Sequence, residues 1–191
     1  MSATVVLAAV LAGLSTTFLG LVDAGRELDA TLSRFDREAA SLNRATLDAV
    51  EHGAPADAIV RPRTSLRRMI DALGSNADRI VRDTAPPYLR GISRSLADVF
   101  ELVPTTDAIN KALGDYLDQT KQAQAEAARN AAAAGLSARL LDLSYEALAQ
   151  RIGEAREHTR QGVARALNGL QFITFISIGI AALAVGLTGE R

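Results

Sequence analysis

Residues 4–22 read TVVLAAVLAGLSTTFLGLV, and this stretch decides the fold class. It contains 19 residues and no charged side chain. At 1.5 Å per residue, a helix of this length is roughly 28 Å long, which is close to the hydrocarbon thickness of a bilayer. The stretch therefore predicts a transmembrane helix over residues 1–24.

A second stretch of the same kind lies near the other end of the chain. Residues 166–189 are uncharged, and their most apolar part, residues 172–187, reads FITFISIGIAALAVGL. Each stretch alone is long enough to cross a bilayer. The simplest interpretation is two transmembrane helices, residues 1–24 and 166–189, with a domain between them over residues 25–165.

Three alternatives remain open. Residues 1–24 would be a cleaved signal peptide if Val22-Asp23-Ala24 marks a cut, although no basic residue precedes the apolar run and the run exceeds the usual length of about 7–15 residues. Both stretches would be core helices of a soluble bundle if polar helices cover them, because a helix that is apolar all round is buried in either protein or lipid. The stretches would also suit helices that insert only after a trigger.

Basic residues flank both stretches on the side of the central segment. Arg26 and Arg34 follow the first stretch, and Arg160 and Arg165 precede the second. Because basic flanks tend to remain in the cytoplasm, we expect the central domain to be cytoplasmic and both termini to lie outside.

Small residues recur one helical turn apart within both stretches. This spacing lets transmembrane backbones approach closely and associate, although Gly, Ala and Thr are also common in any membrane span. The candidates for helix packing are Ala9, Gly13, Ala12, Gly20, Ala182 and Gly186.

The central segment has apolar residues at spacings of three and four, which predict amphipathic helices. One stripe runs from Leu28 to Val50 and ends before Gly53 and Pro55, which terminate helices. Residues 119–134 have few large apolar side chains and predict an exposed or loosely packed helix, with a break or bend at Gly135. Further stripes consist of Leu66, Met69, Ile70 and Leu73, and of Ile109, Leu113, Tyr116 and Leu117.

The long proline-free segment after Gly135 permits one helix from Leu136 into the second apolar stretch. Together, these patterns predict an all-α membrane protein with two terminal transmembrane helices and a central helical bundle.

Charge is unevenly distributed in the central segment. From Arg61 to Arg94, eight arginines stand against three aspartates, a net of +5, whereas from Ser95 to Ala127 six acidic residues stand against two lysines, a net of −4. The opposite blocks would pair across neighbouring helices, or the basic block would contact anionic lipid headgroups at about 1 kcal/mol per basic residue. The candidates for headgroup contact are Arg61, Arg63, Arg67 and Arg68.

The sequence contains no recognisable catalytic motif. It has no cysteine, and its two histidines, His52 and His158, lack the spacing of a di-iron bundle. It has no phosphate loop, no nucleophile elbow and no zinc-protease motif. The net charge of −1 argues against a nucleic-acid binder. We therefore expect no enzymatic activity, no cofactor, no metal site, no nucleic-acid partner and no small-molecule substrate.

Two functional hypotheses follow. The first is a structural or interaction scaffold that contacts membrane lipids and assembles with itself or with a membrane complex. The second is a membrane-permeabilising effector, because an apolar N-terminal helix leading into an amphipathic bundle resembles cell-death proteins of the HeLo kind. That resemblance is in architecture alone, and the second apolar end departs from it. A selective channel is disfavoured because neither stretch contains a charged residue.

Overall fold

The computed structural model describes residues 3–52, 63–73, 90–100, 102, 106–129 and 131–189. Nearly all of these residues are helical, and none of the described residues forms a strand. The all-helical class predicted from the sequence is therefore confirmed. Two of the helices are long and apolar, and they carry the two uncharged stretches.

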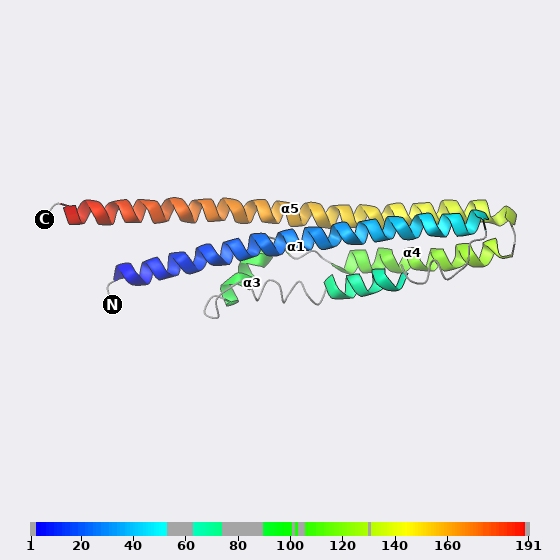
Figure 1. Cartoon of the computed structure of the whole chain (residues 1–191), viewed down its shortest axis with the longest axis horizontal. Helices are drawn as coiled ribbons and strands as arrows, with labels where there is room; N and C mark the ends of the chain where they lie inside the picture. The colour runs from blue at the N-terminus through cyan, green and yellow to red at the C-terminus, as the bar shows by residue number, and fades with distance from the viewer. Residues whose placement is uncertain are drawn as a thin grey trace. The chain divides into compact units, whose positions relative to one another are not determined.

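The helix α1 (Ala3–His52) joins the first apolar stretch and the stripe after it in one helix of 50 residues (Figure 1). No proline lies within it, so no backbone donor is lost and no ring collides with the preceding turn. The helix ends at His52, directly before Gly53. The helix end predicted from Gly53 and Pro55 involves residues outside the described ranges.

The helix α5 (Ala131–Gly189) contains 59 residues and carries the second apolar stretch in its C-terminal part. Gly135 does not interrupt it, contrary to expectation. The chain turns earlier, at Ala128 and Arg129, where the Arg129 amide donates to the Glu126 carbonyl at 2.9 Å. A single glycine inside a helix costs only about 1 kcal/mol, and the continuing turns on both sides offset that cost.

Three shorter helical segments accompany the long helices: residues 63–73, α3 (Arg90–Val99) and α4 (Thr106–Ala127). α4 has Asp107 in its first turn, where a negative charge interacts favourably with the helix dipole. After α3, the Leu102 amide donates to the Ala97 carbonyl at 3.0 Å, which folds the chain back at the end of the helix.

The chain packs as two compact units. Unit 1 consists of Met1–Leu28, Ala77–Val103 and His158–Arg191, and unit 2 consists of Asp29–Asn76 and Pro104–Glu157. Both long helices contribute one part to each unit. The boundary between the units therefore falls inside α1 and α5, whereas the segments expected from the sequence divide the chain at the edges of the uncharged stretches.

In unit 1, α1 and α5 pack against each other and against α3. Phe18 and Val22 of α1 form a buried cluster with Ala166 of α5. The ring of Phe18 also lies 5.6 Å from the ring of Phe100, measured between centroids. Leu21 of α1 completes the contact with the end of α3 through a second cluster that contains Ala97 and Leu102.

In unit 2, the apolar stripes predicted from the sequence form the core. Their buried members are Leu28 at the boundary of unit 1 and, inside unit 2, Leu32, Phe35, Ala39, Leu42, Val50, Leu66, Ile70, Leu73, Ile109, Leu113, Tyr116 and Leu117. Between residues 119 and 129, Thr120 and Ala123 are buried and the other described residues are exposed or half-buried, so the expected exposed helix differs from the structure only on that one face of α4. Small side chains there permit close packing without a large apolar residue.

Candidate functional site

The uncharged ends of α1 and α5 form an antiparallel pair within unit 1. Three contacts fix the register: Gly25 lies against Val163, Val22 packs in one cluster with Ala166, and Gly169 lies against Phe18. Each step along α1 therefore corresponds to a step backwards along α5.

This register places the charged residues that border the two uncharged ends at the same level along the helix pair. Asp23 is the first charged residue of α1 and Arg165 is the last of α5 before the uncharged stretch. They lie between the contacts Val22–Ala166 and Gly25–Val163, and both are exposed. Beyond this level, the described parts of both helices carry no charged side chain.

Two glycines allow the helices to approach closely. A Cβ atom at Gly25 would overlap Val163 Cγ2 and lie 3.0 Å from Leu102 Cδ2. A Cβ atom at Gly169 would lie 2.5 Å from Phe18 Cε1. Such distances are shorter than carbon atoms tolerate, so a side chain at either position would push the helices apart or displace its neighbour.

Large apolar side chains project outward from the uncharged end of α5. Phe172, Phe175, Ile178 and Leu183 are 61–73% exposed. In its most apolar window α5 has a mean hydropathy of 1.7, yet only 6% of that window is buried; the window of α1 has a mean hydropathy of 1.8 and is 28% buried. Both helices are therefore long and apolar enough to span a membrane, and little of their apolar surface is covered within the chain.

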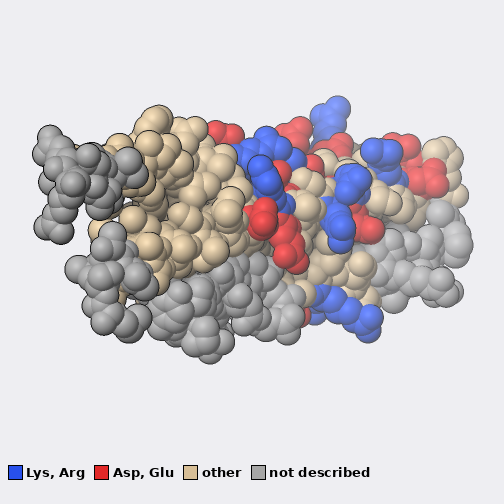
Figure 2. Space-filling model, turned by 60° about the vertical axis from the view of Figure 1, so that its left-hand side comes forward, with Lys and Arg blue, Asp and Glu red and all other residues tan. Residues whose placement is uncertain are grey.

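The face drawn in Figure 2 shows the same separation of charge. The tan surface formed by the described part of the uncharged ends carries no blue or red atoms. Soluble monomeric proteins rarely expose so large a continuous apolar surface. In the described part of the chain, this surface is mostly uncovered.

The hydroxyl groups in the described part of the uncharged ends are bonded within their own helices. Ser15 Oγ donates to the Leu11 carbonyl at 3.0 Å, and Thr17 Oγ1 donates to the Gly13 carbonyl at 2.8 Å. On α5, Ser177 Oγ donates to the Ile173 carbonyl at 2.8 Å. Because each donor has a partner one turn back, these residues add little cost in a medium without water.

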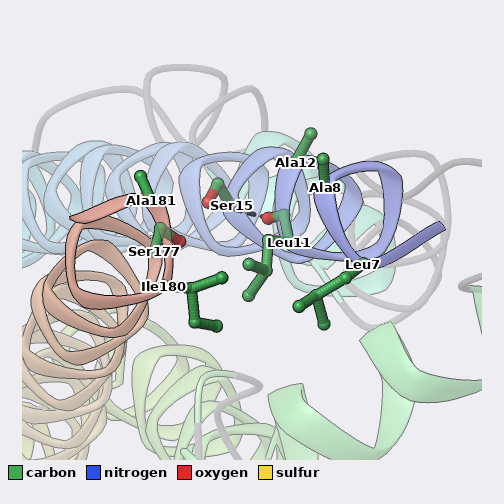
Figure 3. A pocket seen from close by; sticks show the side chains of 8 residues that line it. All are labelled: Leu7, Ala8, Leu11, Ala12, Ser15, Ser177, Ile180 and Ala181. Atoms are coloured by element: carbon green, nitrogen blue, oxygen red, sulfur yellow. Dashed lines mark hydrogen bonds between the residues drawn. The ribbon is translucent and has the colours of Figure 1, made fainter. Parts of the chain in front are cut away.

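An apolar groove of about 380 Å³ opens between the two uncharged ends. Figure 3 shows Leu11 of α1 and Ile180 of α5 in the space between the helices. Ser15 and Ser177 supply the only hydroxyl groups among its lining residues, and both donate to carbonyls of their own helix. The complete lining is Leu7, Ala8, Leu11, Ala12, Ser15, Ser177, Ile180 and Ala181.

The structure separates the candidates for helix packing. Gly13 is buried and Ala12 lines the groove, whereas Ala9 and Ala182 are exposed. Gly20 is half-buried. Gly186 lies in α5, and its burial is outside what the structure describes. The two glycines of closest approach, Gly25 and Gly169, were not among the candidates. The only sequence signal for them is glycine inside a helix that is otherwise rich in good helix formers.

The basic candidates for headgroup contact lie in unit 2. Arg61 lies outside the described residues, Arg67 and Arg68 are exposed, and Arg63 is half-exposed. Lys121 lowers the pKa of the Asp118 carboxyl, and Arg63 and Arg67 contribute to the same shift. At least two members of the basic block therefore lie near an acidic residue of α4, as the pairing interpretation expects; contact with lipid stays a prediction.

A polar network, not foreseen from the sequence, connects three helices of unit 2 and joins the buried Asn43 and Tyr116 to the exposed Asp142. The Tyr116 hydroxyl of α4 donates to Asn43 Oδ1 of α1 at 3.4 Å, and Asn43 Nδ2 donates to Asp142 Oδ1 of α5 at 3.1 Å. The Tyr116 ring lies 6.1 Å from the ring of Tyr145. Burial raises the pKa of Tyr116 well above its ordinary value, and the negative charge of Asp142 adds to the shift.

Neither histidine is placed in a metal site. His52 Nδ1 lies 3.0 Å from Asp48 Oδ1 on an exposed face of α1, and His158 is exposed on α5. Among the described residues, no group of three or more His, Asp or Glu side chains could hold a metal ion.

No family model matches the chain, no curated protein matches it in sequence, and no solved structure matches its fold.

Proposed function

We propose that this chain is a non-enzymatic integral membrane protein. The uncharged ends of α1 and α5 cross the bilayer as an antiparallel pair, and the helices of unit 2 serve as a structural or interaction scaffold at the membrane. The observation that carries the proposal is the common level of Asp23 and Arg165, because it gives the paired helices a single boundary between charged and uncharged surface.

The dimensions of the paired ends suit a bilayer. From Ala3 to Val22, α1 extends for roughly 30 Å, and from Ala166 to Gly189, α5 extends for roughly 36 Å at 1.5 Å per residue. The hydrocarbon core of a bilayer is about 30 Å thick. Transfer of each exposed Phe, Ile or Leu side chain from water contributes about 1.5–3 kcal/mol, so lipid is a favourable environment for this surface.

Antiparallel pairing also bears on orientation. If both uncharged ends cross the membrane, the two helix ends Ala3 and Gly189 emerge on the same side. The basic residues Arg26, Arg160 and Arg165 then lie on the opposite side. The tendency of basic flanks to stay in the cytoplasm favours a cytoplasmic unit 2 with both termini outside.

Membrane fractionation tests the anchoring, with alkaline carbonate extraction and topology reporters at both termini. We expect the wild-type protein to stay in the membrane pellet. Ile178→Lys should weaken retention, because a lysine near the middle of a span costs about 2.5–3.5 kcal/mol. Leu143→Lys is the matched control, since both side chains are 61% exposed on α5 and only Ile178 lies in the uncharged end.

Release of the wild-type protein by carbonate would contradict the proposal. The permeabilising alternative makes a different prediction: purified protein would release dye from liposomes, and a charge at Gly13 or Ala182 would abolish the leakage. Intact liposomes together with stable membrane retention support the scaffold.

A further inference from the structure

The groove between the uncharged ends of α1 and α5 is hollowed out by small side chains. Five of its eight lining residues are alanine or serine: Ala8, Ala12 and Ser15 on α1, and Ser177 and Ala181 on α5. The larger residues Leu11 and Ile180 extend into the space between the helices (Figure 3). Because the small side chains do not fill that space, the two helices leave a groove of about 380 Å³ open within unit 1.

The depth of the groove follows from the antiparallel register of the two helices. Val22 and Ala166 pack in one cluster at the level where the charged residues begin. Along α1, Ser15 lies about 10 Å and Leu7 about 22 Å beyond Val22, at 1.5 Å per residue. Along α5, Ala181 lies about 22 Å beyond Ala166. In a hydrocarbon core about 30 Å thick that begins at this level, the groove straddles the middle of the bilayer.

The lining of the groove suits an apolar ligand. None of its lining residues is charged, and Ser15 and Ser177 donate their hydroxyl hydrogens to carbonyls of their own helices. A buried water molecule needs two to four polar partners, and these two hydroxyl oxygens are the only polar side-chain atoms that the lining offers. Hydrocarbon therefore fits the groove better than water or a polar ligand does.

The width of the groove distinguishes between a hydrocarbon chain and another helix. The groove follows α1 from Leu7 to Ser15, a length of about 12 Å, so its volume corresponds to a mean width of roughly 6 Å. A single line of methylene groups is about 4–5 Å wide, the distance at which apolar carbon atoms are in contact. An α-helix with its side chains is about 10–12 Å across and does not enter a groove of this width.

We propose that one acyl chain of a phospholipid from the surrounding bilayer lies in this groove, in contact with both α1 and α5. A chain against the outward side chains of Phe172 and Phe175 contacts only one helix. Dispersion contacts add up over many atom pairs, so the chain in the groove is held longer than its neighbours. Because the groove straddles the middle of the bilayer, the terminal half of the chain fills it. The proposal rests on the membrane anchoring proposed above and names a ligand of the paired ends.

Photolabelling with a phospholipid tests the site in the full-length chain. The protein is reconstituted into phosphatidylcholine liposomes that contain a small fraction of phosphatidylcholine with a diazirine in the terminal half of one acyl chain. After illumination, mass spectrometry of the digested chain locates the labelled residues. We expect label on Leu11, which lies in the groove. Variants that fill the groove should lose this label, and comparison of one residue between variants removes differences in side-chain reactivity.

Two pairs of neighbouring alanines supply the variants and their controls. Ala181 lines the groove and Ala182 does not, although both are exposed on α5. Ala8 and Ala9 form the corresponding pair on α1. We expect Ala181→Phe and Ala8→Phe each to lower the labelling of Leu11 several-fold, because the added ring occupies the space of the chain. The controls Ala182→Phe and Ala9→Phe should leave the labelling at the wild-type level.

Three results would overturn the proposal. Equal labelling of Leu11 in the wild type and in both groove-filling variants would place the labelled chain elsewhere on the surface. An equal loss in Ala182→Phe would show that the effect does not depend on the groove. Label on Phe175 without label on Leu11 in the wild type would mean that protein covers the groove.

Carbonate extraction is measured separately and distinguishes this inference from the proposed function. A chain that stays in the membrane without labelling in the groove contradicts only the acyl-chain site. Release of the chain by carbonate contradicts the membrane anchoring, whatever the labelling.

The melting temperature in detergent micelles gives a second readout. A ligand that binds only the folded state raises the melting temperature by mass action. We expect added phosphatidylcholine to raise it, up to saturation, for the wild type and for Ala182→Phe. This rise should be lost in Ala181→Phe, and a rise of the same size in that variant would contradict binding in the groove.

Discussion

Gly169 of α5 lies directly against the ring of Phe18 of α1, so that a Cβ atom at this glycine would lie only 2.5 Å from Phe18 Cε1. This contact occurs where both helices are free of charge. It complements the contact of Gly25 with Val163, near the charge boundary. The two glycines together determine how closely the paired ends approach within unit 1.

Gly169→Ala should therefore destabilise unit 1 by about 1–3 kcal/mol, the usual cost of an extra methyl group in a packed contact. Gly179→Ala is the matched control, because nothing lies within 4 Å of a Cβ atom at Gly179 on the same helix. Alanine there should be neutral or stabilising by about 0.5–1 kcal/mol, since it has the higher helix propensity. Denaturant titration in detergent micelles measures both.

The ring contact can be separated from a general effect of alanine by a compensating change. Phe18→Leu shortens the side chain that the new methyl group would meet, so Phe18→Leu with Gly169→Ala should be more stable than the sum of the single changes predicts. Equal stability of the Gly169→Ala and Gly179→Ala variants would show that the ring moves aside without cost.

The network of Asn43, Tyr116 and Asp142 predicts a coupled effect in unit 2. Asn43→Ala should cost about 1–3 kcal/mol, because it leaves the buried Tyr116 hydroxyl without its acceptor. Tyr116→Phe should cost less, since its hydrogen bond is long at 3.4 Å. The double variant should cost less than the sum of both, and additive costs in a double-mutant cycle would contradict the coupling.

The helices of this protein could be predicted from the sequence because their signals are local. The uncharged stretches are recognised by their length and lack of charge, and the apolar stripes between Leu28 and Leu117 by their spacing of three and four residues. The absence of proline after Gly135 permits α5 to continue into the second uncharged stretch. The turn at Ala128 could not be located, because the alanine-rich segment has nearly the same helix propensity before and after it. Gly135 was the stronger breaker by residue type, yet the helix passes through it.

The contacts of the site could not be predicted because they depend on which faces meet. Asn43 and Asp142 are 99 residues apart, and Asn43 and Tyr116 are 73 residues apart. Nothing in the local sequence indicates that these polar residues lie within hydrogen-bond distance of one another. In the same way, Gly25 is identified as a packing residue only when the register of α1 against α5 brings Val163 to it.

The raised pKa of Tyr116 predicts that the folded chain loses stability at alkaline pH. Its pKa in the folded chain is raised by burial, whereas a tyrosine in the unfolded chain titrates near 10. Below pH 10 both states hold the proton and the contribution is constant. Above pH 10 the unfolded state ionises first, so the free energy of unfolding should fall by up to about 1.4 kcal/mol per pH unit for this group.

Tyr116→Phe should remove most of this alkaline slope. Tyr145→Phe should remove less, because Tyr145 is only half-buried, although burial also raises its pKa. Free energies of unfolding at several pH values between 9 and 11 provide the measurement. An unchanged slope in Tyr116→Phe would show that other groups cause the alkaline loss.

Arg156 and Arg151 both lie on α5, and we expect Arg156 to contribute more than Arg151 to the free energy of unfolding. Its Nε atom lies 3.1 Å from Asp29 Oδ1 and its Nη1 atom 4.0 Å from Asp36 Oδ2, and the side chains of Arg156 and Asp29 are each only 26% exposed. Arg156→Met should therefore cost about 1–2 kcal/mol, since a carboxylate that is largely shielded from water loses its partner.

Arg151→Met is the control, because Arg151 pairs with Glu154 one turn away at 52% and 44% exposure. That pair should contribute less than about 0.5 kcal/mol, and a high-salt buffer should screen most of it. The contribution of Arg156 should persist in high salt, because burial limits screening. Urea titrations at low and high salt compare the two variants, and equal losses would mean that Arg156 acts as an ordinary surface charge.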